Sequence, residues 1–182
     1  WCSKGHYNVT PDILIMGKGI ANGYPVTAFM TTEEIMEKAP PHAFSTSYGS
    51  NPVACAAVLA SLEVIEEERL VKNASKVGKF ILKRLKEIQE EHETVGEVRG
   101  KGLLLGMELV KNRRSKEPFQ EAGHLVYRKA FEKGLAWVPA HQNLRMAPPL
   151  IMNEELADKG LRIIEEALTE TEKELKGKYG DK

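Results

Sequence analysis

Short β-like runs alternate with long helical segments along this chain, and the alternation constrains its fold more than any other feature. A short apolar run bounded by turn residues is typical of a buried strand, whereas apolar residues spaced three and four apart indicate an amphipathic helix. The strand-like runs cover residues 12–16, 24–32, 95–110, 135–140 and 143–150. The helical patterns cover residues 32–39, 51–70, 70–93, 117–134 and 153–175. Their alternation predicts an α/β or α+β protein.

Local signals predict where several elements begin, end and face. Asn51 followed by Pro52 predicts a helix start, and Asn153 predicts another. Gly134 predicts a helix end. The run DILIM is continuous and apolar, so we expect a strand buried on both faces. The helix after Pro52 begins small and apolar and ends acidic, which predicts a buried first half. The inner helical faces are expected to carry Val77, Phe80, Ile81, Leu85, Ile88, Leu156, Leu161, Ile164 and Leu168.

The charge balance argues against several classes of partner. The 182 residues include 26 basic and 26 acidic side chains, so there is no basic excess for nucleic acid or an anionic membrane. No apolar run approaches the roughly 20 residues of a membrane span. The five histidines lack metal-ligand spacing, and so do Cys2 and Cys55. We therefore expect no metal and a cytoplasmic location.

Lys18 stands between Gly17 and Gly19, directly after the first predicted strand. Burial in an apolar setting would favour its neutral amine, which is the nucleophile that forms a Schiff base with a carbonyl. The flanking glycines would leave room for a flat ring on that amine. The alternative is an ordinary loop lysine, because most lysines are solvated.

The stretch STSYGSNP places hydroxyl groups ahead of a predicted helix N-terminus. Ser45, Thr46 and Ser47 are hydroxyl donors, and free backbone N–H groups at the helix start would favour an anion such as phosphate. The alternative is a simple turn followed by a cap.

Arg145 interrupts the otherwise apolar strand NLRMAPPL. A buried guanidinium is unfavourable unless it is paired, and its planar fork suits a carboxylate. A structural Asp or Glu is the alternative partner. Arg99 is expected instead to form a strand-end ion pair. A pyridoxal phosphate (PLP) enzyme acting on amino acids requires a nucleophilic amine, a phosphate-binding site and a group that binds a carboxylate. The three candidates together would supply them.

Four ordered blocks resemble the class III, fold-type I, PLP-dependent aminotransferases: PDILIMGKGIANGYPVTAFMTTEEIME, STSYGSNPVACAAVLASLEVIEEE, VRGKGLLLGMELV and LRMAPPLIMNEE. This family includes 4-aminobutyrate, ornithine and acetylornithine aminotransferases. The resemblance implies that residues 1–72 form the C-terminal end of the large PLP-binding α/β domain with the interdomain helix. It implies that residues 73–182 form the small C-terminal α/β domain. The implied reaction moves an amino group from an amino acid, including ω-amino acids such as 4-aminobutyrate, to a 2-oxo acid.

The resemblance also implies a role for each candidate residue. Lys18 matches the Schiff-base lysine, which also carries the Cα proton. Ser47 matches a threonine that contacts the cofactor phosphate across a dimer interface, and Thr46 matches its neighbour. Arg145 matches an arginine that several members use for the substrate carboxylate. A homodimer with shared sites is therefore expected.

Three features of the family precede its lysine block: a phosphate loop, an aromatic residue on the pyridine ring and an Asp paired with the ring nitrogen. This sequence begins after them, so we expect a part of a longer enzyme with little or no activity alone. One alternative is an amino-acid racemase of the same fold, and another is an inactive folding or dimerisation module. A nucleotide-binding GKGIANG loop is weaker, because its glycines miss the GxGxxG spacing.

Overall fold

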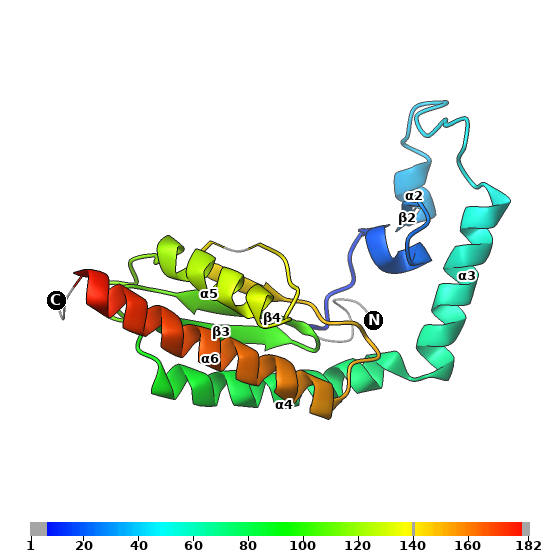
Figure 1. Ribbon diagram of the computed structural model, residues 1–182. Coiled ribbons are helices and arrows are strands. Elements are labelled where there is room, and N and C mark those ends of the chain that lie inside the picture. The colour runs from blue at the N-terminus through cyan, green and yellow to red at the C-terminus, as the bar shows by residue number, and fades with distance from the viewer. Residues whose placement is uncertain (1–6, 140, 180–182) are drawn as a thin grey trace. The chain divides into compact units, whose positions relative to one another are not determined.

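The computed structural model describes residues 7–139 and 141–179, and they form two compact units (Figure 1). Unit 1 ends at Val71 and unit 2 begins at Lys72, so the boundary falls in the first turn of the helix α4 (Leu70–Glu91). Both units mix helices and strands, which confirms the predicted fold class. Cys2, His6 and the last residue of the predicted strand 135–140 lie outside the described residues.

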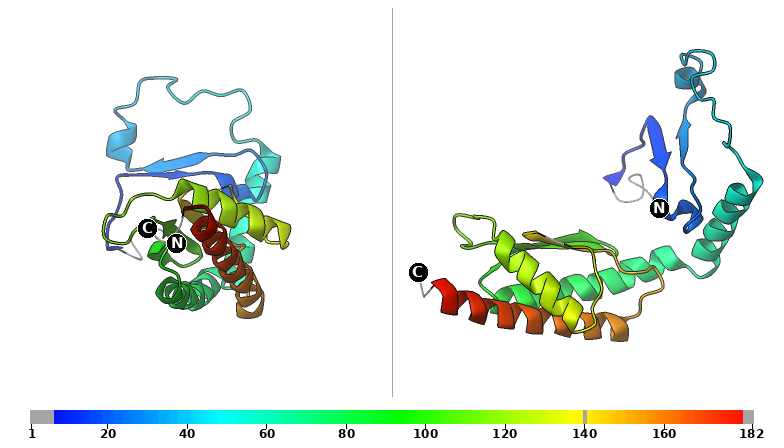
Figure 2. Two further views of the ribbon diagram at one scale, coloured as in Figure 1. Left: turned by 60° about the vertical axis from the view of Figure 1, so that its left-hand side comes forward. Right: turned by 45° about the horizontal axis from the view of Figure 1, so that its top comes forward.

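Unit 1 is built on a two-stranded antiparallel sheet (Figure 2). The strand β1 (Ile13–Met16) pairs with β2 (Ala28–Thr31), and the short helix η1 (Lys18–Ala21) follows β1 directly. A short helix α2 (Glu33–Met36) and the long helix α3 (Pro52–Glu67) complete the unit. Thr32 precedes α2 as predicted, but its side chain makes no capping hydrogen bond.

The apolar residues of unit 1 are less buried than the sequence predicts. Ile13 is 51% exposed and Ile15 is 77% exposed, so the expectation of a strand buried on both faces is wrong for the described residues. The physical reason is that, among the described residues, β1 has one neighbouring strand and only one of its faces is partly covered, at Leu14 and Met16. The predicted buried start of α3 is also wrong, since Ala54 is the only buried residue of that helix.

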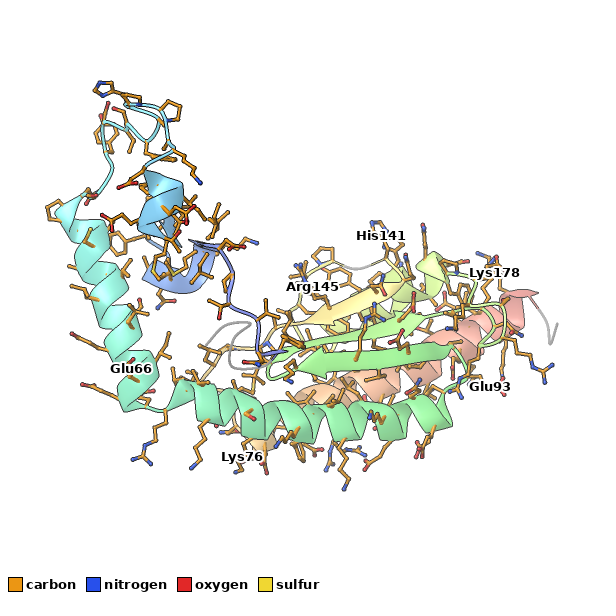
Figure 3. All side chains as sticks on the ribbon, turned by 180° about the vertical axis from the view of Figure 1, so that it is seen from behind. Glu66, Lys76, Glu93, His141, Arg145 and Lys178 are labelled. Atoms are coloured by element: carbon orange, nitrogen blue, oxygen red, sulfur yellow. The ribbon has the colours of Figure 1, made fainter. Side chains whose placement is uncertain are left out.

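Unit 2 consists of one sheet and three helices. The strands β3 (Val95–Lys101), β4 (Leu104–Leu109) and β5 (Asn143–Met146) form an antiparallel sheet in the order β3-β4-β5. The helices are α4, α5 (Gln120–Glu132) and α6 (Glu154–Tyr179). Figure 1 shows α5 and α6 in front of the sheet, and the reverse view in Figure 3 shows the sheet in front of α6. One face of the sheet therefore carries these helices.

The core of unit 2 follows the predicted helical faces. Val77, Ile81, Leu85 and Ile88 of α4 are all buried, Phe80 is partly buried, and they pack with apolar side chains from both other helices and all three strands. On α6 the predicted Leu161, Ile164 and Leu168 are buried as well.

Two predictions for unit 2 are wrong. Leu156 is 55% exposed, because the buried stripe of α6 begins at Ala157 and Leu156 lies beside that stripe on the helix surface. Residues 135–139 form no strand; the backbone leaves α5 at Gly134, whose φ of +94° ends the helix as predicted.

Candidate functional site

Lys18 is one of seven described non-glycine residues with a left-handed backbone, and its environment is not the one that the sequence predicts. It adopts φ +55°, a left-handed conformation that costs a non-glycine residue about 1–2 kcal/mol. Such strain is concentrated at functional sites. Its side chain is exposed, so the predicted apolar setting is absent from the described part of unit 1.

The space around Lys18 is open enough for a bulky, flat group. A β-carbon added at Gly19 would meet no atom within 4 Å, and one added at Gly17 would touch only the Thr27 methyl group at 3.3 Å and the Val26 carbonyl. Gly17 itself is extended, with φ −172°. No ion pair or hydrogen bond engages the Lys18 amine among the described residues. An exposed, unpaired amine beside open space fits a PLP ring.

The hydroxyl loop before α3 is tightly turned and exposed. A β-carbon at Gly49 would lie 2.3 Å from the Thr46 side chain, so Gly49 allows the turn to fold back on Thr46. Both Thr46 and Ser47 are exposed. Among the described residues, neither makes a hydrogen bond to Lys18.

The N-terminus of α3 is capped as predicted, and this corrects the prediction of a phosphate seat made of free N–H groups. The Asn51 side chain accepts from the N–H groups of Val53 and Ala54 at 3.0 and 3.1 Å, and its carbonyl accepts from Cys55. Pro52 has no N–H group. The first turn therefore has no backbone donor left for an anion, and the hydroxyl groups of the preceding loop remain as donors.

Arg145 lies on the open face of the unit 2 sheet, so the expectation that it is buried is wrong. Along β5 the side chains alternate: Leu144 and Met146 are buried and Arg145 is exposed (Figure 3). The period-two alternation of a strand explains this, because neighbours of a core residue point away from the core. The described residues provide no carboxylate partner for Arg145.

Sequence reasoning missed that Arg145 shares a row of the sheet with Arg99. Both residues register with Gly106 of β4, one from each side. Arg99 pairs with Glu97 at 3.1 Å and with Glu108 at 3.8 Å, which confirms its predicted structural role. Of the two, Arg145 is the guanidinium without an internal partner. The alternation in VRGKGLLLGMELV is the signal that places Arg99 on the same face.

The described residues give no sign of a metal cluster or a membrane span. Nowhere in residues 7–139 and 141–179 do three His, Cys, Asp or Glu side chains gather as metal ligands. None of the described helices combines the length and the apolar character needed to cross a membrane.

The family comparison covers most of the chain. Residues 1–168 match the class III aminotransferase family model, so this chain belongs to the class III aminotransferase family. Enzymes of this family depend on PLP, and solved structures similar to the chain include fold-type I transaminases.

Curated relatives include both racemases and aminotransferases. The chain is 43% identical to an alanine/serine racemase of Pyrococcus horikoshii, covering 94% of this chain and 36% of the racemase. It is 41% identical to a leucine/methionine racemase of Thermococcus litoralis, covering 100% of this chain and 40% of the racemase. It is 37% identical to an acetylornithine aminotransferase of Caldanaerobacter subterraneus, covering 91% of this chain and 40% of that enzyme.

Solved structures agree with this assignment. A transaminase solved with L-alanine superimposes with a TM-score of 0.86 at 33% identity, covering 94% of this chain and 43% of the other. An (S)-enantioselective omega-transaminase from Thermomicrobium roseum gives a TM-score of 0.84 at 34% identity, covering 92% of this chain and 39% of the other. The chain thus spans about two fifths of the length of these relatives.

Proposed function

We propose that this chain is the lysine-bearing, C-terminal part of a PLP-dependent enzyme that transfers an amino group from an amino acid to a 2-oxo acid. The observation that carries the proposal is the conformation of Lys18, held at φ +55° between two glycines with an exposed, unpaired amine. In this proposal unit 1 is the C-terminal end of the large PLP-binding domain, and unit 2 is the small domain.

Each candidate side chain has a proposed role. PLP, when bound, supplies an aldehyde that condenses with amines and a ring that delocalises the electrons of a broken Cα–H bond. Lys18 would hold the cofactor through Nζ, and its neutral amine would be the group that accepts and returns the Cα proton. The hydroxyl groups of Thr46 and Ser47 donate to the phosphate. Arg145 binds the substrate carboxylate through two parallel N–H donors.

Two finer proposals concern the donor and the assembly. Arg145 recognises a carboxylate and not the position of the amine, so ω-amino acids such as 4-aminobutyrate are included as donors. The exposed loop with Thr46 and Ser47 makes no hydrogen bond to Lys18 within this chain. We assign its hydroxyl groups to the cofactor of a second subunit in a homodimer, because Ser47 matches the family threonine that contacts the cofactor phosphate across a dimer interface.

A racemase is the second candidate, and the two racemases at 43% and 41% identity favour it. In a racemase the same Lys18 would remove the Cα proton from one face, and the substrate would be reprotonated on the other face. No oxo acid would then be released. The two candidates differ in whether a 2-oxo acid is needed as a co-substrate.

Reductive trapping tests the cofactor assignment on the chain as it exists. PLP is added to the purified chain, borohydride is added, and peptide mass spectrometry locates the pyridoxyl group. We expect one dominant site at Lys18, and its loss in Lys18→Arg. The matched control is Lys38→Arg, an exposed lysine of the same unit paired with Glu34, which should leave the labelling unchanged. Equal labelling of Lys18 and Lys38 would refute the assignment.

Activity is tested by completing the chain with the upstream portion of the Thermococcus litoralis racemase, either fused or co-expressed. Transfer predicts product from an L-amino acid only when a 2-oxo acid is present. Racemisation predicts the D-enantiomer without any 2-oxo acid. Lys18→Arg in the completed enzyme should abolish either activity, while Lys38→Arg should not.

A further inference from the structure

Two histidines of unit 2 meet on its surface, away from any role in the proposed chemistry. His124 lies on α5, and His141 lies two residues before β5. Nε2 of His124 and Nδ1 of His141 are 3.2 Å apart, and the rings cross edge to face at 84°. Both side chains are exposed. Figure 3 labels His141 close to β5, the strand that carries Arg145.

The two ring nitrogens form a hydrogen bond, in which one ring donates its N–H group to the other, and their separation is also close to that of two imidazole nitrogens bound to one metal ion. Zinc–imidazole bonds are about 2.0–2.1 Å long, so two nitrogens at a tetrahedral angle stand about 3.3 Å apart. The observed 3.2 Å is within about 0.2 Å of that value. Because both rings are exposed, they can turn so that their lone pairs converge on one point in solvent.

The backbone beneath the pair is held in place by close packing. A β-carbon added at Gly123 would lie 1.5 Å from the His141 carbonyl oxygen, so the segment before β5 rests directly on α5. The next carbonyl, that of Gln142, accepts from the N–H group of Leu109 at 2.7 Å. Only the two side chains remain to be ordered by an ion, which lowers the entropic cost of binding.

We propose that His124 and His141 form a bidentate surface site for Zn²⁺ or a similar borderline divalent ion, with water in the remaining positions. Imidazole is a preferred ligand of such ions. Glu121 lies one turn earlier on α5, but its carboxylate is paired with Lys178 at 2.6 Å. No third protein ligand joins the pair in the described residues. The site is thus open and exchangeable, and its ion would tie α5 to the segment that enters β5.

The test uses the full chain without an affinity tag, freed of metal and then titrated with Zn²⁺ by calorimetry. We expect one equivalent to bind. Loss of one ligand should weaken binding by at least about tenfold in His124→Gln and in His141→Gln. The matched control is His42→Gln, an exposed histidine of unit 1, which should bind as the unchanged chain does. Binding to the folded state should also raise the thermal midpoint of the unchanged chain and not that of the double variant.

A second measurement needs no variant. Long-range ¹H–¹⁵N spectra of the histidine rings report each ring nitrogen, and Zn²⁺ should shift Nε2 of one ring and Nδ1 of the other together. The proposal is overturned if the two rings do not shift with one equivalent. It is also overturned if both single variants bind as tightly as the unchanged chain, which would mean dispersed binding to surface carboxylates.

Discussion

The buried pair of His92 and Glu172 allows a sharp prediction of how the stability of unit 2 depends on pH. Nδ1 of His92 lies 2.9 Å from Glu172 Oε2, and the two side chains are only 8% and 19% exposed. The other Glu172 oxygen accepts from the Thr94 hydroxyl at 2.6 Å and from the Thr94 N–H group at 3.3 Å. Through these hydrogen bonds Glu172 links α6 to the residues that directly follow α4.

The pair shifts two pKa values in opposite directions. The hydrogen bond to Glu172 raises the pKa of His92, and this outweighs the opposing effect of burial. Burial raises the pKa of Glu172, but hydrogen bonds from His92 and Thr94 outweigh it, so the net direction is down. Glu165 and Glu91 also raise the pKa of His92 through their charges.

The signs define the pH range in which the pair stabilises the fold. A raised histidine pKa contributes stability that is complete below its ordinary value of 6.5 and is lost as the pH rises through the folded-state value. A lowered glutamate pKa contributes stability that is complete above its ordinary value of 4.5 and is lost as the pH falls through the folded-state value. The pair therefore contributes most to the free energy of unfolding between pH 4.5 and pH 6.5.

Glu172→Gln should destabilise unit 2 by about 2 kcal/mol between pH 5 and 6, the usual size for a hydrogen bond to a charged group. This corresponds to a fall of roughly 8 °C or more in the thermal midpoint. The difference in the free energy of unfolding between the variant and the unchanged chain should become smaller towards pH 9. Unfolding by urea at each pH, followed by circular dichroism, measures it.

The matched control is Glu174→Gln on the same helix. Glu174 pairs with Lys129 and is 48% exposed, so its loss should cost less than about 0.5 kcal/mol. The reasoning is refuted if the two variants are equally stable at pH 5.5, or if the cost of Glu172→Gln is the same at pH 5.5 and pH 9.

Three further predictions concern packing and capping. Gly123→Ala should destabilise unit 2 by about 1–3 kcal/mol, because its β-carbon would clash with the His141 carbonyl. Gly177→Ala, whose β-carbon would meet no atom within 4 Å, should stabilise α6 slightly. Equal thermal midpoints for the two variants would contradict this prediction. Leu85→Ala should cost about 2–5 kcal/mol in urea unfolding, whereas Leu104→Ala, at 63% exposure, should cost less than about 0.5 kcal/mol. Asn51→Ala should cost α3 about 1 kcal/mol, seen as faster amide exchange at Val53 and Ala54, while Asn51→Asp should retain their protection.

Local features of the fold were predictable because their causes lie within a few residues. Asn51 caps α3 through the N–H groups two and three residues later, and Asn153 caps α6 through Leu156 in the same way. The apolar stripe of α4 was equally clear, since its period alone selects the buried face. For the site, local sequence indicates Lys18 between its glycines, and the left-handed backbone there agrees with a special role.

Features that depend on distant partners were not predictable. Arg145 sits in an apolar stretch and suggested burial, yet the register of β5 against β4 turns it to the open face. The exposed strand β1 is another case, because burial depends on which neighbours cover a strand and not on its own composition.

The sequence by itself predicted most of the helices and strands, the caps at Asn51 and Asn153 and the family, and it singled out Lys18 as a candidate, because short-range spacing encodes each of them. Only the tertiary structure decided which side chains meet across long separations. Glu172 reaches His92 across 80 residues, and His141 reaches His124 because α5 has a glycine where the two backbones touch. Such contacts follow from how elements pack, and packing joins residues that carry no signal of each other in the chain.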